Sequence, residues 1–502
     1  MKRLTELTEL ISKHKIKQLD VIGLSNDTST PQRLYRIISE EKVETDKEAA
    51  KLLAKDSARD LSYKRAKNKL LRRLINTVLF IDAKKAMYNN YQTAYYNCWK
   101  NFAAAKILVG KSANINGNIL LAETLHIASK YEFTELAMHI AKQLRYQYGG
   151  LEGNRKLFDQ YNEIYKRHEA IFIAENIVDE HYTRLITYFA SNRSKEGGLK
   201  EEANKSLKEI NLSKLLEDFD SYQLHLRGRM IQLMALSGYE QKMDYIQACD
   251  DAISFFKEKI DVNPNSIHVF MHYKIVCCIQ YLDYQAGKTA IENALAQATP
   301  NTHNWFLDRY YSIMLSLRCG FYEEAYAAFK LLESNKRLKN QSDQITEGFN
   351  LVRAYIHYLG AISKIKVVKQ SRFNIKNFLR NIPVFSRDKE GLNIPVLIIH
   401  ILLLIQQKDY EQIVSRLDAL RKYGGKYIKE KERPRLICFI HMLGRIPMSR
   451  FHREATIRNA KKFRDRLADY PIREYGQNFA IEIIPYEELW EMVVNSLDNK
   501  MH

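Results

Sequence analysis

The chain has 502 residues, of which 46% are hydrophobic and 27% charged, so it can bury a sizeable core and is not globally disordered. Its formal net charge of +19 is concentrated at two ends: about +7 in residues 1–80, about +15 in residues 363–475, about −4 in the last 27 residues and about +1 in between. Such asymmetry favours a polyanionic or acidic partner, because clustered cations release counterions when they neutralise phosphates. The alternative is that the basic helix faces only keep the protein in solution.

Composition also excludes several classes of protein. The low counts of Gly (19) and Pro (9) favour helices over strands. No apolar run reaches the roughly 18 residues that a membrane span needs, and residues 395–405, PVLIIHILLLI, are too short and contain His400. The first 15 residues lack the apolar stretch of a secretory signal. The six cysteines show no paired spacing, so we expect no disulfide framework, no zinc cluster and a reducing, cytoplasmic setting.

Apolar periodicity predicts four helices at the N-terminus, over residues 2–18, 31–41, 46–55 and 62–81. The last of these buries Ala66, Leu70 and Leu74 on one side. Its other side is a candidate polyanion-binding surface formed by Lys64, Arg65, Lys69, Arg72 and Arg73.

The order of the last three helices, with a small second and a basic third, resembles a helix-turn-helix or winged-helix module. That resemblance implies that the basic helix lies in the DNA major groove. No wing hairpin is expected after it, since the helical pattern continues to residue 81. The other interpretation, which we favour, is that these helices cap the end of a helical array.

Residues 110–112, Gly-Lys-Ser, match the end of a phosphate-binding P-loop. A P-loop needs a glycine at position 105, which is Ala, and a strand before it, whereas the preceding residues have a helical pattern. We therefore expect a helix C-terminus here and no nucleotide cofactor.

The stretch GFYEEAYAAF, residues 320–329, is typical of the second helix of a helical hairpin. Gly320, Tyr322, Ala325 and Phe329 occupy the positions that recur in this helix of a tetratricopeptide repeat, so the region resembles that family. The resemblance implies that Ala325 lets the two helices of the repeat approach and that Phe329 fills the groove towards the next pair.

Weaker copies of the pattern lie at residues 237–256, 282–295 and 407–420. Their tyrosines and Tyr322, in the order 239, 284, 322 and 410, are 45, 38 and 88 residues apart. The last gap is about two units long, so we predict a further degenerate repeat over residues 348–364.

His268 and His272 are four residues apart on one helical face, which is a spacing found in metal sites. No third ligand is close in sequence, so we expect ordinary core or surface histidines and no bound metal. No nucleophile motif or dinucleotide fingerprint stands out, and we expect no enzyme and no cofactor.

Two basic segments near the C-terminus are further candidates for polyanion binding. They contain Lys426, Lys429, Lys431 and Arg433 in a predicted loop over 422–435, and Lys461, Lys462, Arg464 and Arg466 in a predicted helix over 458–474. Nucleic acid and an acidic protein are alternative partners for them.

Together these patterns predict an all-α protein: a right-handed solenoid of stacked antiparallel helix pairs with an N-terminal helical module. We expect the module in residues 1–85, helical hairpins in 86–195, degenerate tetratricopeptide-like repeats in 196–430 and a C-terminal helical cap, basic then acidic, in 431–502. The expected function is a non-enzymatic, cytoplasmic scaffold that binds a protein or peptide on the inner surface of the array. The alternative is a nucleic-acid-binding transcription regulator that uses the N-terminal module, with the repeats as its sensor. We expect no membrane partner.

Overall fold

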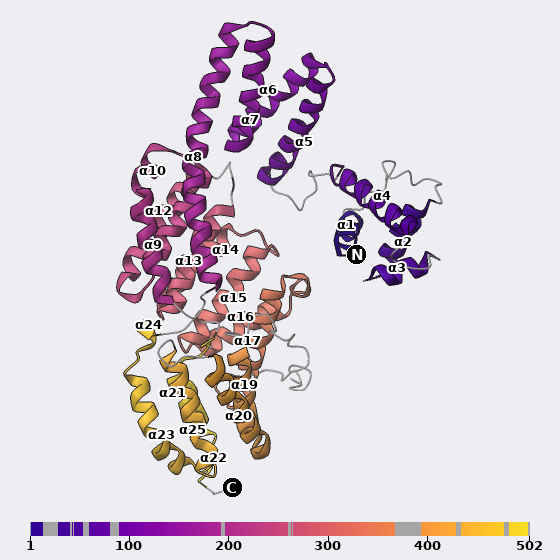
Figure 1. Ribbon diagram of the computed structural model, residues 1–502. Helices are drawn as coiled ribbons and strands as arrows, with labels where there is room; N and C mark the ends of the chain where they lie inside the picture. The colour runs from indigo at the N-terminus through magenta and orange to yellow at the C-terminus, as the bar shows by residue number, and fades with distance from the viewer. Residues whose placement is uncertain are drawn as a thin grey trace. The chain divides into compact units, whose positions relative to one another are not determined.

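The computed structural model describes residues 2–13, 29–40, 43, 45–53, 60–80, 90–191, 196–259, 263, 265–366, 393–427, 433–475 and 481–499. Every regular element within these ranges is a helix, which confirms the all-α prediction (Figure 1). None of these helices is long and apolar enough to cross a membrane. The chain forms two compact units, residues 1–172 and 173–502. The boundaries predicted after residues 85, 195 and 430 stay predictions.

The described residues of unit 1 form two apolar cores. Its helices are α1 (Lys2–Lys13), α2 (Thr30–Glu40), α3 (Asp46–Leu52), α4 (Leu61–Val78), α5 (Asn90–Gly110), α6 (Asn114–Lys130), α7 (Thr134–Arg145), the π-helix η2 (Tyr146–Leu151) and the first part of α8 (Arg155–Ser191). One core joins α1 to α4 and includes the fully buried Leu34, Leu70 and Leu74. The other joins α5 to α7 and includes Leu121 and Ile140. Each core is made by the helix faces on which apolar residues recur every three or four positions.

Unit 2 contains the second part of α8 and a longer series of helices. They are α9 (Glu196–Ile210), α10 (Leu212–Asp218), α11 (Tyr222–Ala235), η3 (Tyr239–Gln241), α12 (Lys242–Glu258), α13 (Asn265–Gln280), α14 (Tyr284–Gln297), α15 (His303–Arg318), α16 (Tyr322–Glu333), η4 (Leu338–Asn340), α17 (Asp343–Ala361), α19 (Asn393–Gln407), α20 (Tyr410–Tyr427), α21 (Pro434–Leu443), α22 (Arg445–Met448), α23 (Arg453–Ala468), α24 (Ile472–Tyr475) and α25 (Tyr486–Asn495).

Within the described residues, one kind of turn follows at least six helices. Each turn has one residue in the left-handed region, with φ between +55° and +78°, and the next residue donates its N–H to the carbonyl five positions earlier at 2.8–3.1 Å. This is the Schellman motif, which satisfies carbonyls at a helix C-terminus. The left-handed residues are Ser112, Glu132, Leu282, Gly320, Ser363 and Lys408. A new helix begins two residues after five of them, so the motif sets a tight connection between antiparallel helices.

In unit 2 these turns recur at nearly regular intervals. Positions 282, 320, 363 and 408 are 38, 43 and 45 residues apart. Tyr284, Tyr322 and Tyr410 are the first residues of the helices that follow three of the turns, and Tyr239 begins the short helix before α12. The turn at Ser363 divides the interval of 88 residues between Tyr322 and Tyr410, in the segment where the sequence predicted a further repeat.

Helices in the middle of unit 2 pack in chain order. From α11 to α16, each helix packs against the next one (Figure 1). In addition, α13 packs against α15, and α15 against α17. Helix α15 therefore contacts α13 and α17 as well as α14 and α16, its two neighbours in the chain.

The stretch that resembled a tetratricopeptide repeat forms the turn before α16 and most of α16 itself. Gly320 has φ of +78°, a conformation that costs a residue with a Cβ about 1–2 kcal/mol. Ala325 is fully buried, and the ring of Phe329 stacks on Phe349 of α17 at 4.9 Å. Tyr322 donates a hydrogen bond to Glu488 of α25. This stretch thus connects α16 to both the next helix and the C-terminal region.

Two predicted breaks are partly helical. Helix α20 continues through Gly424 and Gly425 to Tyr427, so residues 422–427 are not the loop that the sequence suggested. Likewise α9 begins at Glu196 and includes Gly197 and Gly198. In both segments the helix extends through consecutive glycines, although glycine disfavours a helix interior by about 1 kcal/mol per residue.

A buried arginine organises the C-terminal region. Arg435 at the start of α21 is fully buried, and its guanidinium donates to both carboxylates of Glu482 and Glu487 at 2.6–3.2 Å and to the carbonyl of Tyr470. Burial alone would lower the pKa of Arg435, but the bonds and charges of the two carboxylates raise it. Arg318 of α15, also fully buried, donates to the backbone carbonyl of Glu482. These bonds connect α15, α21 and the segment before α25.

Candidate functional site

The exposed side of α4 carries positive charge without a neighbouring acid on the same helix. Residues 61–80 contain no Asp or Glu. Lys64, Arg65, Lys69 and Arg72 are exposed, and we call these four residues the α4 basic face. Arg73, the fifth predicted residue, is half-buried. The face therefore presents cations to solvent over about two helical turns.

The opposite side of α4 is packed along its length. Tyr63, Ala66, Leu70 and Leu74 are buried, and α4 packs against α1 and α2. A helix held in this way is a fixed support for the α4 basic face. Helix α4 has the packed side that is needed to cap the end of a helical array. It also has the exposed side that a DNA-binding helix needs.

Asp46 of α3 fixes the start of α4. It accepts hydrogen bonds from the Tyr63 hydroxyl at 2.8 Å and from Lys67 Nζ at 2.6 Å. Burial alone would raise the pKa of Asp46, but the bonds from Lys67 and Tyr63 lower it to about 2. Lys67 is thereby paired within the unit, whereas no ion pair joins the α4 basic face to another described residue.

The C-terminal candidates divide into described and undescribed residues. On α23, Lys461, Lys462 and Arg464 are exposed and lie within one helical turn, while Arg466 is half-buried. Arg464 is 3.7 Å from the carboxylate of its neighbour Asp465. Arg433 is half-buried before α21; Lys429, Lys431 and the side chain of Lys426 lie outside the described residues. The expectation that these two basic segments bind a polyanion therefore stays a prediction.

A cavity of about 490 Å³ lies in unit 1, within the 300–1,000 Å³ that is usual for ligand pockets. We call it the α5–α8 pocket. Its lining comes from α5, α7, η2 and the start of α8, and consists of Phe102, Lys106, His139, Lys142, Gln143, Arg145, Tyr146, Gly150 and Phe158. The lining thus combines cations with aromatic rings, and it includes no carboxylate.

Among the described residues, no ion pair neutralises the cations of this pocket. Lys106 Nζ donates to Gln143 Oε1 at 2.8 Å, and Arg145 donates to Asn162 Oδ1 at 2.8 Å. Arg145 also lies 4.3 Å from the centre of the Tyr165 ring. Amide oxygens and an aromatic face hold a cation in place but carry no full negative charge, so these cations keep their positive charge.

A π-helix shapes one wall of the pocket. Tyr146 and Gly150 belong to η2, and π-helical turns occur frequently at functional sites. Gly149 is needed beside them, because a Cβ there would be 2.5 Å from Cδ2 of Phe158. Glycine at this position lets Phe158 form the wall.

The Gly-Lys-Ser motif is part of a Schellman turn. Gly110 ends α5, Ser112 has φ of +64°, and Ala105 is a buried residue inside the helix. The local backbone is therefore a helix terminus, as the sequence predicted, and has no strand before it as a P-loop requires.

Sequence reasoning did not find the α5–α8 pocket. A signal exists in hindsight: Phe102 and Lys106 are four residues apart on α5, and His139, Lys142 and Tyr146 follow each other at three and four residues. Each set occupies one helix face, but only tertiary structure brings the two faces together. Comparison with models of known protein families, with curated proteins and with solved structures found no match.

Proposed function

We propose that this protein is a non-enzymatic, cytoplasmic scaffold that binds an acidic segment of a partner protein on the inner surface of stacked helix pairs. The observation that carries the proposal is the α5–α8 pocket, with its cations, its aromatic rings and no lining carboxylate. In a right-handed solenoid of helix pairs, alternate helices form the inner surface. Helices α5 and α7 alternate in this sense, since α6 lies between them in the chain and packs against both.

Peptide selection from a random display library tests this proposal. The library is panned against the full-length protein at about 100 mM salt, where exposed charges still act over about 10 Å. We expect enrichment of peptides that combine Asp or Glu with an apolar or aromatic residue. Replacing Lys106 and Lys142 by Gln should remove most of the enrichment of these acidic peptides.

A matched control separates pocket binding from a general effect of charge. Lys336 and Lys339 are exposed lysines of unit 2, and K336Q/K339Q removes the same charge as K106Q/K142Q. Selected peptides should bind the control variant as well as the wild type. Equal loss in both variants, or no acidic enrichment on the wild type, would refute the pocket as the partner site.

The α4 basic face supports a second function, that of a nucleic-acid-binding regulator. Four exposed cations on a helix without acidic residues fit a phosphate backbone, and Ser62 and Asn68 are exposed beside them. Fluorescence anisotropy with mixed duplex DNA and with structured RNA, over about 50 to 300 mM salt, tests this function.

The test variant replaces Lys64, Arg65, Lys69, Arg72 and Arg73 by Gln, and the control replaces the exposed Arg458, Lys461, Lys462 and Arg464. Binding with a steep salt dependence that only the first variant loses would support the regulator function. Binding that is lost only in the control variant would place the nucleic-acid-binding site on α23 instead. Absence of binding at low salt would refute the regulator function and leave only the scaffold function as a proposal.

A further inference from the structure

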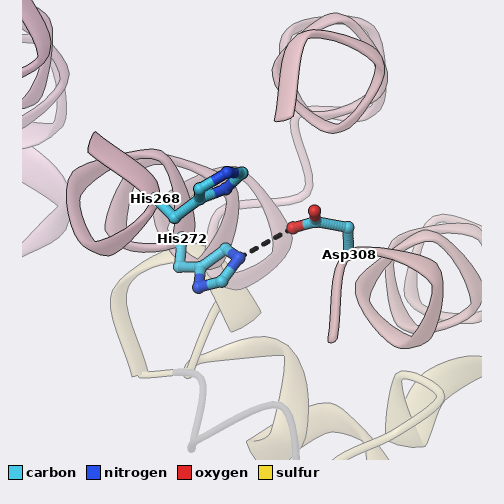
Figure 2. Close-up of side chains that lie close together, drawn as sticks. All are labelled: His268, His272 and Asp308. Atoms are coloured by element: carbon cyan, nitrogen blue, oxygen red, sulfur yellow. Dashed lines mark hydrogen bonds and ion pairs between the residues drawn. The ribbon is translucent and has the colours of Figure 1, made fainter. Parts of the chain in front are cut away.

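Tertiary structure places a third metal-ligating side chain beside the histidine pair of α13. His268 and His272 lie on one face of α13, and Asp308 of α15 faces them (Figure 2). One donor atom from each of the three residues lies within 4.8 Å of the other two. Local sequence patterns do not indicate this third residue, because Asp308 is 36 positions beyond His272.

The cluster is buried and only partly satisfied. His272 Nε2 lies 2.7 Å from Asp308 Oδ1, and the Asp308 side chain is fully buried. The second carboxylate oxygen, Oδ2, makes no hydrogen bond within the described residues, nor does Nδ1 of the buried His268. Leaving such groups unpaired costs about 1–3 kcal/mol each, and more when the group is charged. Two lone-pair donors in one buried cluster suit a metal ion, which would satisfy both.

One ring nitrogen of His268 is held by the backbone, and the other is not. The backbone of Gln297 hydrogen-bonds to the same ring, and since Nδ1 has no partner we assign that bond to Nε2. A backbone carbonyl on one ring nitrogen fixes the tautomer and leaves the other nitrogen free as a ligand.

We propose that His268, His272 and Asp308 form a binding site for Zn²⁺ that links α13 to α15. Two imidazoles and one carboxylate are a ligand set that zinc accepts at about 2.0–2.2 Å from each donor. Three donors within 4.8 Å of one another reach such distances by side-chain adjustments smaller than about 1 Å. The 2.7 Å hydrogen bond between His272 and Asp308 is then replaced by one bond from each residue to the metal. The metal ion binds one of the two carboxylate oxygens of Asp308, Oδ1 or Oδ2.

The site has an entry and one open position. The His272 side chain is 14% exposed, so the ion reaches the site without unfolding of the unit. With three protein ligands, a tetrahedral zinc keeps a fourth position for water. Because α13 and α15 are the first helices of consecutive pairs, the ion would hold two neighbouring pairs together.

Cys277 and Cys278 lie further along α13 and are buried. Neither belongs to the cluster of donor atoms that lie within 4.8 Å of one another. Among the described residues, the proposed ligand set therefore contains nitrogen and oxygen donors only.

The test is metal binding by the full-length protein after treatment with a chelator. Competition with a chromophoric chelator measures the stoichiometry and the Kd for Zn²⁺, and thermal unfolding is recorded with and without the ion. We expect one strong site per chain, with a Kd below about 1 μM, and a rise in Tm on adding Zn²⁺. Co²⁺ as a probe should give a tetrahedral absorption spectrum without a thiolate charge-transfer band.

Three variants locate the site, and one serves as a control. H268Q, H272Q and D308N should each weaken Zn²⁺ binding by about 100-fold or more and abolish the rise in Tm. H303Q removes an exposed histidine from the same helix as Asp308 and should bind like the wild type. Because His272 is at the surface of the cluster, H272Q keeps the test valid if D308N does not fold.

Several results would overturn the proposal. These are the absence of strong Zn²⁺ binding in the wild type, a Tm unchanged by the ion, a thiolate band with Co²⁺, or binding that H268Q and H272Q retain in full. In any of these cases the three residues are a hydrogen-bonded pair and a core histidine, without a metal.

Discussion

The two units use charged side chains in opposite ways. In unit 1 the α4 basic face and two lysines of the α5–α8 pocket, Lys106 and Lys142, are exposed. The groups that hold Lys106 and Arg145 include amide oxygens. In unit 2 Arg435 and Asp308 are fully buried, and their bonds join helices that are distant in sequence. Charge at the surface changes what the protein binds, whereas buried charge decides whether the fold is stable.

Removing Arg435 should have the largest effect on stability. Arg435→Ala leaves the buried Glu482 and the partly exposed Glu487 without their cation, which typically costs 3–5 kcal/mol, about the loss expected for a broken buried ion pair. Urea unfolding followed by tryptophan fluorescence in a Trp99→Phe background measures it, because Trp305 and Trp490 then report on unit 2 alone. Arg458→Ala, an exposed arginine on α23, should change the free energy of unfolding by less than about 0.5 kcal/mol. Similar losses in both variants would contradict the contrast between buried and exposed charge.

Acid should destabilise unit 2 through its buried histidines. His225 stacks on Phe255 at 3.9 Å, and burial, together with the charge of Arg229, lowers its pKa to about 4. The unfolded chain binds the proton at its usual pKa near 6.5, so stability is full above about pH 6.5 and falls as the pH drops towards 4. At pH 5 this one group accounts for a loss of about 2 kcal/mol.

The variant His225→Phe keeps the aromatic contact and removes the titration. Its unfolding free energy is measured at several pH values between about 7 and 5. Over this range it should fall by about 2 kcal/mol less than that of the wild type. The comparison concerns the slope, since the variant also loses the bond between Nε2 and the Phe219 carbonyl. Parallel curves would show that His225 is protonated equally in both states.

The Schellman turns predict smaller effects of opposite sign. Ser112 and Ser363 are exposed and have φ of +64° and +60°, so Ser→Gly at either position relieves backbone strain and should stabilise its unit by up to about 1 kcal/mol. Gly320→Ala should destabilise unit 2 by about 1 kcal/mol, because a residue with a Cβ is strained in the left-handed conformation. The added Cβ itself would clash with no neighbouring atom. Thermal unfolding of the three variants checks the signs. A destabilising Ser363→Gly would mean that the turn contributes through its side chain.

The α4 basic face should matter least for stability. Replacing Lys64, Arg65, Lys69 and Arg72 by Gln leaves the buried side of α4 intact and should change the unfolding free energy by less than about 0.5 kcal/mol per residue. Hydrogen exchange of the α4 amides measures the effect locally. A large loss of protection would show that these cations stabilise the helix itself, contrary to a role in binding.

Local sequence patterns determined the helices, because helix formation depends on periodicity and capping within a few turns. The apolar spacing of residues 62–81 predicted α4, and Gly320 with Ala325 predicted the turn and the buried side of α16. Gly320 was identified through the resemblance to a tetratricopeptide repeat, in which a glycine recurs at this position. Leu282, Ser363 and Lys408 adopt the same left-handed conformation although they are not glycine, so residue type alone does not indicate these turns.

Only tertiary structure decided which charged groups meet. Asp308 joins His268 and His272 across two helices, Arg435 meets Glu482 47 positions later, and α5 faces α7 across the α5–α8 pocket. No local pattern encodes such contacts, because the angle and register between helices are set by the whole core. The sequence by itself therefore determined an all-α chain with basic ends. Helix packing determined which of its charges are buried partners and which are open to a ligand.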